Sequence, residues 1–336
     1  MTLTSSVHAA LAVLALSLGA ACGGPPSAAE PAAAARSAAA AEQKSSHASA
    51  RRLLFAADAL HATLIQAFGP VDGWLALTTE DVIYLGPDAG IVRGRGAVRA
   101  ALVAGQPVGA RISVKRTLAG GDLSADGSFG FTFGWFEQTA RAADGSVAVT
   151  HGTYTACWRR VGALFLVEAD LAKVYPLAHD PVREGFPLLV SGPGAQGTPR
   201  PGEVADLRAG LLDADRQFEA DSLAEGYSQA FVDHAAPFAM PIGGKNFYFL
   251  EGAPEIAAFY AGWTPAETLA WTPRFAGTGA SGDLGYTAGT SDDAYTNPDG
   301  SVDHYYGTYL TLWRRESGGG WRWIADGGND SPPPSP

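Results

Sequence analysis

The stretch Asp299–Arg315, DGSVDHYYGTYLTLWRR, is nearly repeated 155 positions earlier at Asp144–Arg160, where the chain reads DGSVAVTHGTYTACWRR. Both copies contain an Asp-Gly turn signal, a central Gly-Thr-Tyr and a final Trp-Arg-Arg. An Asp-Gly turn before a strand-forming run predicts a β-hairpin. A chain of 336 residues suits about two domains, so we interpret the repeat as one domain present twice.

The segments around each copy follow the same order, with helices first and strands after them. Apolar residues at spacings of three and four predict a helix from about Ala50, and Gly69-Pro70 is expected to interrupt it. Four strand patterns follow in each half. The sequence therefore predicts an α+β protein in which each half is a curved mixed or antiparallel sheet wrapped on about three helices.

Three phrases of the second half carry a resemblance to a known family. GDLGYTAG at Gly282–Gly289, the phrase at Asp299, and GGWRWIADGG at Gly319–Gly328 resemble the SnoaL-like/DUF4440 branch of the NTF2-like superfamily, to which the ketosteroid-isomerase-like proteins also belong. The resemblance covers about 204–330 well and 51–176 more weakly, through the repeat. It implies two tandem NTF2-like domains, each a cone with a pocket at its open end. Because enzymes and dimerisation modules share this fold, it does not fix the activity.

The N-terminus has the pattern of an export signal. The apolar run Ala9–Ala21 is too short to span a bilayer but fits the core of a signal peptide. Small residues and Cys22 follow, which resembles a bacterial lipoprotein signal whose cysteine is lipidated. We therefore expect an exported protein anchored to a membrane through Cys22, either facing the periplasm or in the outer membrane; plain secretion is the alternative.

These signals divide the chain into six segments. They are a signal peptide (1–21), an Ala/Pro/Ser-rich tether expected to be disordered (22–50), a divergent first domain (51–176), a Pro/Gly-rich linker (177–203), a second domain (204–330) and a disordered tail (331–336).

The charge distribution bears on the partners. From Val204 to the end there are 18 acidic and 7 basic residues, so the whole net charge of −11 lies in the second half. Such a surface repels phosphate backbones, and we expect no nucleic-acid partner. The sequence contains no metal-ligand spacing and no nucleotide-binding fingerprint opening a helix, so we predict no metal and no cofactor.

The acid–base residues of ketosteroid isomerases do not transfer to this chain. Those enzymes use an Asp base with a Tyr and a protonated acid, but the first helix of neither half contains a Tyr. The remaining catalytic candidates are Asp233, His234, His304 and Asp326. The sequence leaves open which face of the strand containing His304 lines the cone. We expect the second domain's ligand pocket to be lined by Trp271, Tyr286, His304, Tyr306, Tyr309 and Asp326.

Three functions compete at this stage. The favoured one is a cell-envelope lipoprotein whose domains bind a small apolar or amphipathic molecule, or a protein partner, without catalysis. The second is an isomerase or cyclase that uses acid–base residues of the second domain's pocket. The third is a scaffold in which the two domains form an intramolecular pseudo-dimer, or in which two chains form a homodimer.

Overall fold

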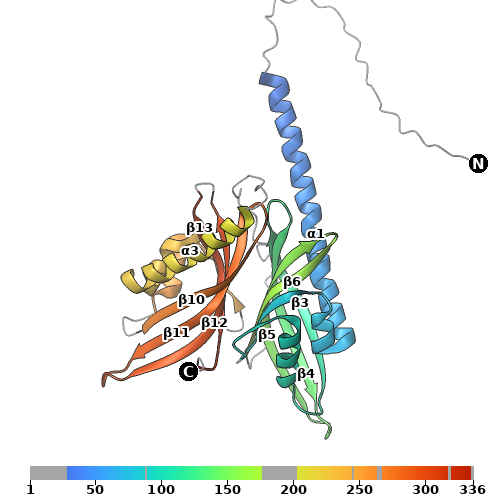
Figure 1. Ribbon diagram of the computed structural model, residues 1–336, viewed down its shortest axis with the longest axis vertical. Helices are drawn as coiled ribbons and strands as arrows, with labels where there is room; N and C mark the ends of the chain where they lie inside the picture. Colours follow the sequence, from blue (N-terminus) through green and yellow to red (C-terminus); the bar gives the residue numbers. More distant parts are fainter. Residues whose placement is uncertain are drawn as a thin grey trace, which may run out of the picture. The chain divides into compact units, whose positions relative to one another are not determined.

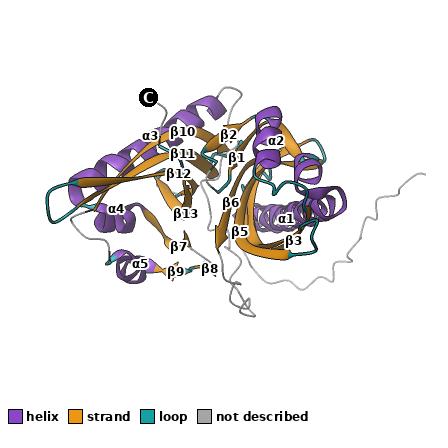
Figure 2. Ribbon diagram, turned by 90° about the horizontal axis from the view of Figure 1, so that it is seen from below, coloured by secondary structure: helices purple, strands orange, loops and turns teal. Residues whose placement is uncertain are grey.

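The structure is a computed structural model, and it describes residues 29–87, 89–175, 203–243, 246–262, 267–316 and 319–333. Residues 45–336 form one compact unit that contains both halves of the repeat. Each half has its helices on one face of a long twisted sheet (Figures 1 and 2). The predicted signal peptide, Cys22 and the linker up to residue 202 lie outside the described residues.

The first half builds a sheet in the order β2-β1-β6-β5-β4-β3, antiparallel except for the parallel pair β1 and β6. Its elements are α1 (Ala29–Leu75), β1 (Thr78–Leu85), β2 (Ile91–Arg93), α2 (Arg95–Ala104), β3 (Arg111–Leu123), β4 (Phe129–Arg141), β5 (Val147–Val161) and β6 (Leu164–Tyr175).

The second half repeats this plan in a sheet of order β10-β11-β12-β13-β7-β8, in which β7 and β13 are parallel and the short β9 also pairs with β7. Its elements are α3 (Glu203–Glu225), α4 (Tyr227–His234), β7 (Ala235–Gly243), β8 (Asn246–Phe247), β9 (Leu250–Glu251), α5 (Gly252–Tyr260), β10 (Glu267–Thr278), β11 (Leu284–Thr296), β12 (Val302–Arg315) and β13 (Trp321–Asp330).

The two halves match strand for strand, with β1, β3, β4, β5 and β6 equivalent to β7, β10, β11, β12 and β13. The predicted fold class is confirmed as two tandem α+β domains, each a mixed sheet packed against helices. The hairpin prediction is confirmed as well. Gly145 and Gly300 adopt φ of 87° and 84°, a region that favours glycine, and the preceding Asp144 and Asp299 each accept a bond from a serine amide two residues on.

The helix α1 begins earlier than the sequence predicted. Residues 29–50, expected to be an unstructured tether, are helical, since alanine has the most favourable helix propensity and the buried helix after them supplies a nucleus. The predicted break is present, because Gly69 is not helical. By length and composition Ser46–Leu75 could cross a membrane, yet Leu54, Asp58 and His61 within it are buried in the first domain.

A buried polar network holds the helix to the sheet in each half. In the first half, Thr132 and Tyr154 donate to the two oxygens of Asp58 at 2.7 and 3.0 Å, and the indole of Trp158 donates to Thr132. Because a buried carboxylate is stable only when its oxygens are bonded, this network fixes the position of α1 on β4 and β5.

The second half contains the same network. Asp215 of α3 accepts hydrogen bonds from Tyr309 and from Trp271, both at 2.8 Å, and Trp313 donates to Thr287. Thr287, Tyr309 and Trp313 lie 155 residues after their counterparts of the first half. Since both copies keep this arrangement, we interpret it as a requirement of the fold.

The other faces of the two sheets pack against each other. Cys157 and Leu312, equivalent positions of the repeat, are both fully buried in one apolar cluster, where the ring of Phe129 stacks on that of Tyr286 at 6.0 Å. The cluster also includes Phe131, Phe133, Trp135, Leu171, Met240, Ile242, Leu284, Ala288, Leu310 and Ile324. The halves therefore form an intramolecular pseudo-dimer through sheet-on-sheet contact.

Hydrogen bonds at this interface occur in reciprocal pairs. The amide of Ala125 donates to Asp283 at 3.0 Å, and the amide of Ala280 donates to the Ser128 hydroxyl at 2.8 Å. Ala280 and Asp283 are the repeat equivalents of Ala125 and Ser128. Such reciprocity is the signature of a two-fold interface, here formed between two halves of one chain.

We predict that Tyr154→Phe and Tyr309→Phe each lower the free energy of unfolding by about 1–3 kcal/mol, because each leaves one oxygen of a buried carboxylate without its donor. Denaturant titration measures the change. The control is Tyr305→Phe on the same β12 strand, where the ring is 60% exposed and the expected loss is below about 0.5 kcal/mol. An equal loss in all three variants would refute the network's role.

Candidate functional site

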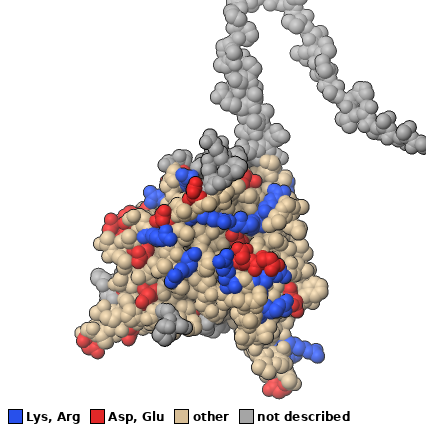
Figure 3. Space-filling model, viewed as in Figure 1, with Lys and Arg blue, Asp and Glu red and all other residues tan. Residues whose placement is uncertain are grey.

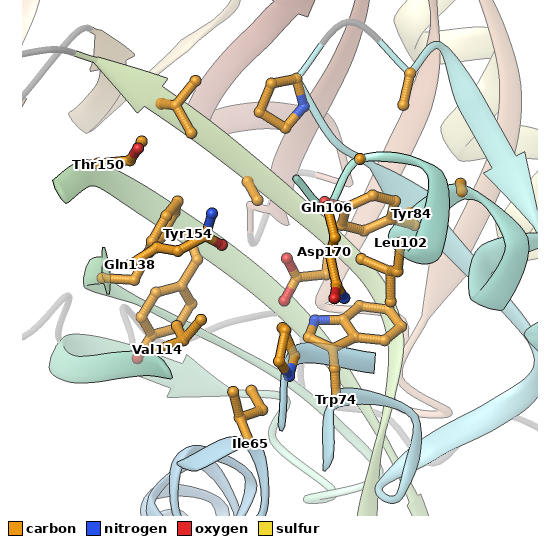
Figure 4. Close-up of a pocket in the computed structure, with 18 of the residues that line it drawn as sticks. Ile65, Trp74, Tyr84, Leu102, Gln106, Val114, Gln138, Thr150, Tyr154 and Asp170 are labelled. Atoms are coloured by element: carbon orange, nitrogen blue, oxygen red, sulfur yellow. The ribbon is translucent and has the colours of Figure 1, made fainter. Parts of the chain in front are cut away.

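Each half encloses a cavity between its helices and the inner face of its sheet. The first cavity, of about 610 Å³, lies among α1, α2, β1 and β3–β6 and is bounded by Trp74, Tyr84, Arg116, Tyr154 and Asp170. Figure 4 shows Trp74, Tyr84 and Leu102 on one side of it and Val114, Gln138 and Thr150 on the other. This volume lies within the range of small-molecule sites, which is about 300–1,000 Å³.

A buried charged cluster forms the floor of the first cavity. Arg116 of β3 donates to Asp170 of β6 at 3.3 Å, and the two side chains are only 5% and 1% exposed. The guanidinium also lies over the ring of Tyr154, 3.5 Å from its centroid. Arg116 thus stays charged inside the protein because a carboxylate and an aromatic face replace the water it loses.

His61 completes this cluster in a defined tautomer. Its Nε2 lies 2.7 Å from the carbonyl oxygen of Trp74, which can only accept, so Nε2 carries the proton. Its Nδ1, 3.3 Å from Arg116, is then free to accept from the guanidinium. Burial, together with the charge of Arg116, lowers the pKa of His61 to about 3, so the imidazole is neutral. Burial raises the pKa of Asp170 to about 6 despite the adjacent guanidinium.

The second cavity, of about 440 Å³, is built from the equivalent elements but has different chemistry. It is bounded by Tyr227, Trp271, Tyr309 and Asp326, together with Lys173, which β6 of the first half contributes. By strand register, Trp271 replaces Arg116. Phe218, the counterpart of His61 on α3, packs against Trp271 at 4.8 Å between ring centroids. In the second half, packed aromatic rings therefore occupy the positions that the charged cluster occupies in the first half.

Asp326 lies on the wall of the second cavity. Thr311 donates to one of its carboxylate oxygens at 2.6 Å. Burial raises the pKa of Asp326 to about 7, with Asp215 adding to the shift and Thr311 and Lys173 opposing it. The carboxyl group therefore changes its charge near neutral pH.

The structure separates the residues that the sequence grouped into one pocket. Trp271, Tyr306, Tyr309 and Asp326 line the second cavity. Tyr286 does not, because its side of β11 faces the other sheet in the apolar cluster. His304 does not either: it is 45% exposed and its Nδ1 lies 2.7 Å from Asp292.

The predicted acid–base pair Asp233 and His234 lies at the end of α4, outside the residues that line the second cavity. Asp233 is exposed and accepts from Gln229. His234 bonds to Asp221 at 2.7 Å and stacks on Phe218. Of the four catalytic candidates, Asp326 alone is among the described residues that line these two cavities.

Sequence reasoning missed Arg116, His61 and Asp170 as a group, because they come from β3, α1 and β6. One signal was available. Asp170 and Asp326 occupy equivalent positions of the last strand in each half. The equivalent positions of β3 and β10 hold Arg116 in the first half and Trp271 in the second, and this difference marks where the two cavities diverge.

Two features of the described residues concern metals and surface charge. No group of three or more His, Cys, Asp or Glu side chains in this part of the chain is arranged to hold a metal ion. On the face shown in Figure 3, basic and acidic side chains lie beside one another.

Neither a protein-family model nor a curated protein matches the chain. Solved structures resemble parts of it, each at low identity. A ketosteroid isomerase-like protein from Erwinia carotovora is 16% identical over 40% of this chain and 100% of its own, with a TM-score of 0.32. An NTF2-like protein from Novosphingobium aromaticivorans is 15% identical over 38% and 83%, with a TM-score of 0.31.

A third similar structure is a putative calcium/calmodulin dependent protein kinase II association domain from Xanthomonas campestris, 18% identical over 44% of this chain and 99% of its own, with a TM-score of 0.30. These are likenesses of fold alone. Each half of the chain has an NTF2-like fold. The finer assignment to the DUF4440 branch stays a prediction.

We predict that Asp326→Asn gains stability relative to the unchanged chain as pH rises from about 5 to about 8. The pKa of the carboxyl group is about 7 in the folded protein, against an ordinary value of 3.8, so its favourable contribution to stability is lost as pH rises towards 7. The amide does not titrate. Denaturant titration at both pH values gives the difference, and a pH-independent difference would contradict the raised pKa.

Proposed function

We propose that the protein binds a small, neutral, largely apolar organic molecule in the first cavity. The observation that carries this proposal is a cavity of about 610 Å³ whose floor is a buried Arg116–Asp170 ion pair. Aromatic walls with a few convergent polar groups are the usual composition of small-molecule sites.

The comparison between the two halves supports a functional origin for this ion pair. A buried ion pair is often no more stabilising than apolar residues of similar volume. The second half folds with Trp271 and Phe218 at the positions of Arg116 and His61, so the fold does not require charge there. The buried ion pair costs free energy of desolvation, and the fold does not need it. We therefore expect that it is kept because it contacts a ligand.

The chemistry of the lining limits the ligand. The charges of Arg116 and Asp170 compensate each other, which disfavours a strongly charged guest. Trp74, Tyr84 and Phe136 offer aromatic surface, while Gln106, Gln138 and Thr150 offer donors and acceptors. A flat amphipathic molecule with one or two polar groups fits this set.

Catalysis is the less supported alternative. An isomerase or cyclase needs an acid and a base around one reactive volume. In the second cavity, only Asp326 of the proposed acid–base residues is in place, and in the first cavity Asp170 is already engaged by Arg116. Binding without catalysis therefore remains our proposal.

Binding is tested by filling each cavity in turn. Val114 and Leu269 are equivalent positions of β3 and β10 that line the first and the second cavity. We predict that Val114→Trp lowers the affinity for the neutral dye Nile red at least about tenfold, because the indole occupies the ligand's volume. Fluorescence titration of the full chain measures it.

The matched control is Leu269→Trp, which adds the same ring to the other cavity and should leave this affinity within about twofold. A second control, Lys115→Trp, places the ring on an exposed position of β3 beside Val114. Unchanged dye binding in a folded Val114→Trp variant would overturn the proposal.

We further propose that the protein acts in the cell envelope, exported by its N-terminal signal and held to a membrane by a lipid on Cys22. The apolar run that ends in small residues before this cysteine supports the proposal. Secretion without an anchor is the alternative.

The anchor is tested by Cys22→Ser in a bacterial host supplied with an alkyne-labelled fatty acid. The unchanged protein should carry the label and sediment with membranes, while the variant should lose the label and become soluble, because serine offers no thiol for acylation. Cys157→Ser, at the other, fully buried cysteine, is the control and should keep the label. An unlabelled wild type would favour plain secretion.

A further inference from the structure

We infer that the second cavity is a binding site for an organic ammonium ion, a ligand class distinct from the neutral molecule proposed for the first. The inference does not rest on the first cavity's function. It rests on the aromatic walls of the second cavity, on the carboxylates that line it, and on the way its one lining lysine is engaged.

The walls form an aromatic cage. On one side, the rings of Tyr227, Phe231 and Tyr260 pack together, with centroid distances of 4.2 and 4.5 Å from Phe231 to the other two. Trp271 and Tyr309 line the same cavity from β10 and β12. Aromatic faces carry negative potential, and a cage of them binds alkylammonium groups in preference to neutral ones.

Carboxylates line the cage at two depths. Asp326 lies on the wall, with Thr311 bonded to one of its oxygens. Asp293 lies on β11, and its Oδ1 is buried without a hydrogen-bond partner among the described residues. A buried carboxylate oxygen without a partner costs free energy, and a bound cation would remove that cost.

The surroundings of Asp293 add to the negative potential. Burial, and next the charges of Glu267 and Asp292, raise the pKa of Asp293. Neighbouring carboxylates disfavour its ionised form, so a cation that enters relieves this repulsion. The excess of acidic residues in the second half would also draw a cation towards the cavity.

Lys173 is the one basic residue among those that line this cavity. Its ammonium donates to the carbonyl oxygen of Gly328 at 2.8 Å, so it is held to the strand β13. Burial lowers the pKa of Lys173. Asp293, Asp326 and Asp330 outnumber it on the lining, which is net negative at a pH above the pKa of Asp326, about 7.

The same features favour an organic cation over a metal ion. Calcium and magnesium require several oxygen ligands around one point. The described residues hold no such cluster, and the second cavity has large aromatic surfaces instead. An ammonium group with alkyl substituents uses both the rings and a single carboxylate.

The test is isothermal titration calorimetry of the full chain with choline and with dimethylbutanol, the neutral isostere in which carbon replaces nitrogen. We expect choline to bind at least about tenfold more tightly than dimethylbutanol, a difference of about 1.4 kcal/mol. Equal binding of the two probes, or no choline binding at any attainable concentration, would overturn the inference.

Variants locate the site. At pH 8, above the pKa of Asp326 of about 7, Asp326→Asn should weaken choline at least about fivefold and leave dimethylbutanol unchanged, because only the charge is removed. Asp293→Asn tests the second carboxylate and should weaken choline about threefold or more, which keeps the inference testable if one variant does not fold. Loss of dimethylbutanol binding to the same extent would indicate a packing defect and overturn the charge-based explanation.

The cavity-filling pair assigns choline to one half of the chain. Leu269→Trp should abolish choline binding, and Val114→Trp should leave it unchanged. The reverse result would place the cation in the first cavity and overturn the inference. Because Nile red reports on the first cavity and choline on the second, each proposal can fail without the other.

Discussion

The contact between the two sheets determines where the cavities lie. Side chains alternate across a β-strand, so each strand has one face towards the other sheet and one towards its own helices. The interface buries the apolar face of β12, which contains Leu310 and Leu312. Tyr309 and Thr311, on the opposite face, then line the interior of the second domain. The strand side chains that line the two cavities depend on that choice of face.

The sequence could predict the fold because the repeat shows the same order of elements twice. Its hairpins were predictable, since Asp-Gly-Ser forms the turn locally. It could not decide which face of β12 is the inner one, because each face of that strand has aromatic and apolar residues. His304 of that strand was expected in the pocket and lies exposed beside Asp292, and Tyr286 of the neighbouring β11 faces the other sheet.

The charged cluster of the first domain was beyond prediction for another physical reason. Arg116, His61 and Asp170 are far apart in the chain and meet because β3, α1 and β6 converge on one cavity. The repeat preserves only the carboxylate, as Asp170 and Asp326, because Trp271 and Phe218 occupy the other two positions in the second half. Residues that the two halves share indicate what the fold requires. Residues that differ indicate candidates for function, but only when the strand register shows which positions are equivalent.

The duplication also explains how two unlike cavities can coexist in one compact unit. Lys173 donates to the carbonyl of Gly328, and Asn329 donates to the carbonyl of Ala172, so equivalent residues exchange bonds across the interface. Ala172 lines the first cavity and Gly328 the second. The backbone at the interface is thus held from both sides, while the side chains that face each interior are free to differ. A symmetric interface with asymmetric interiors allows one half to keep a neutral, charge-compensated cavity and the other an acidic aromatic one.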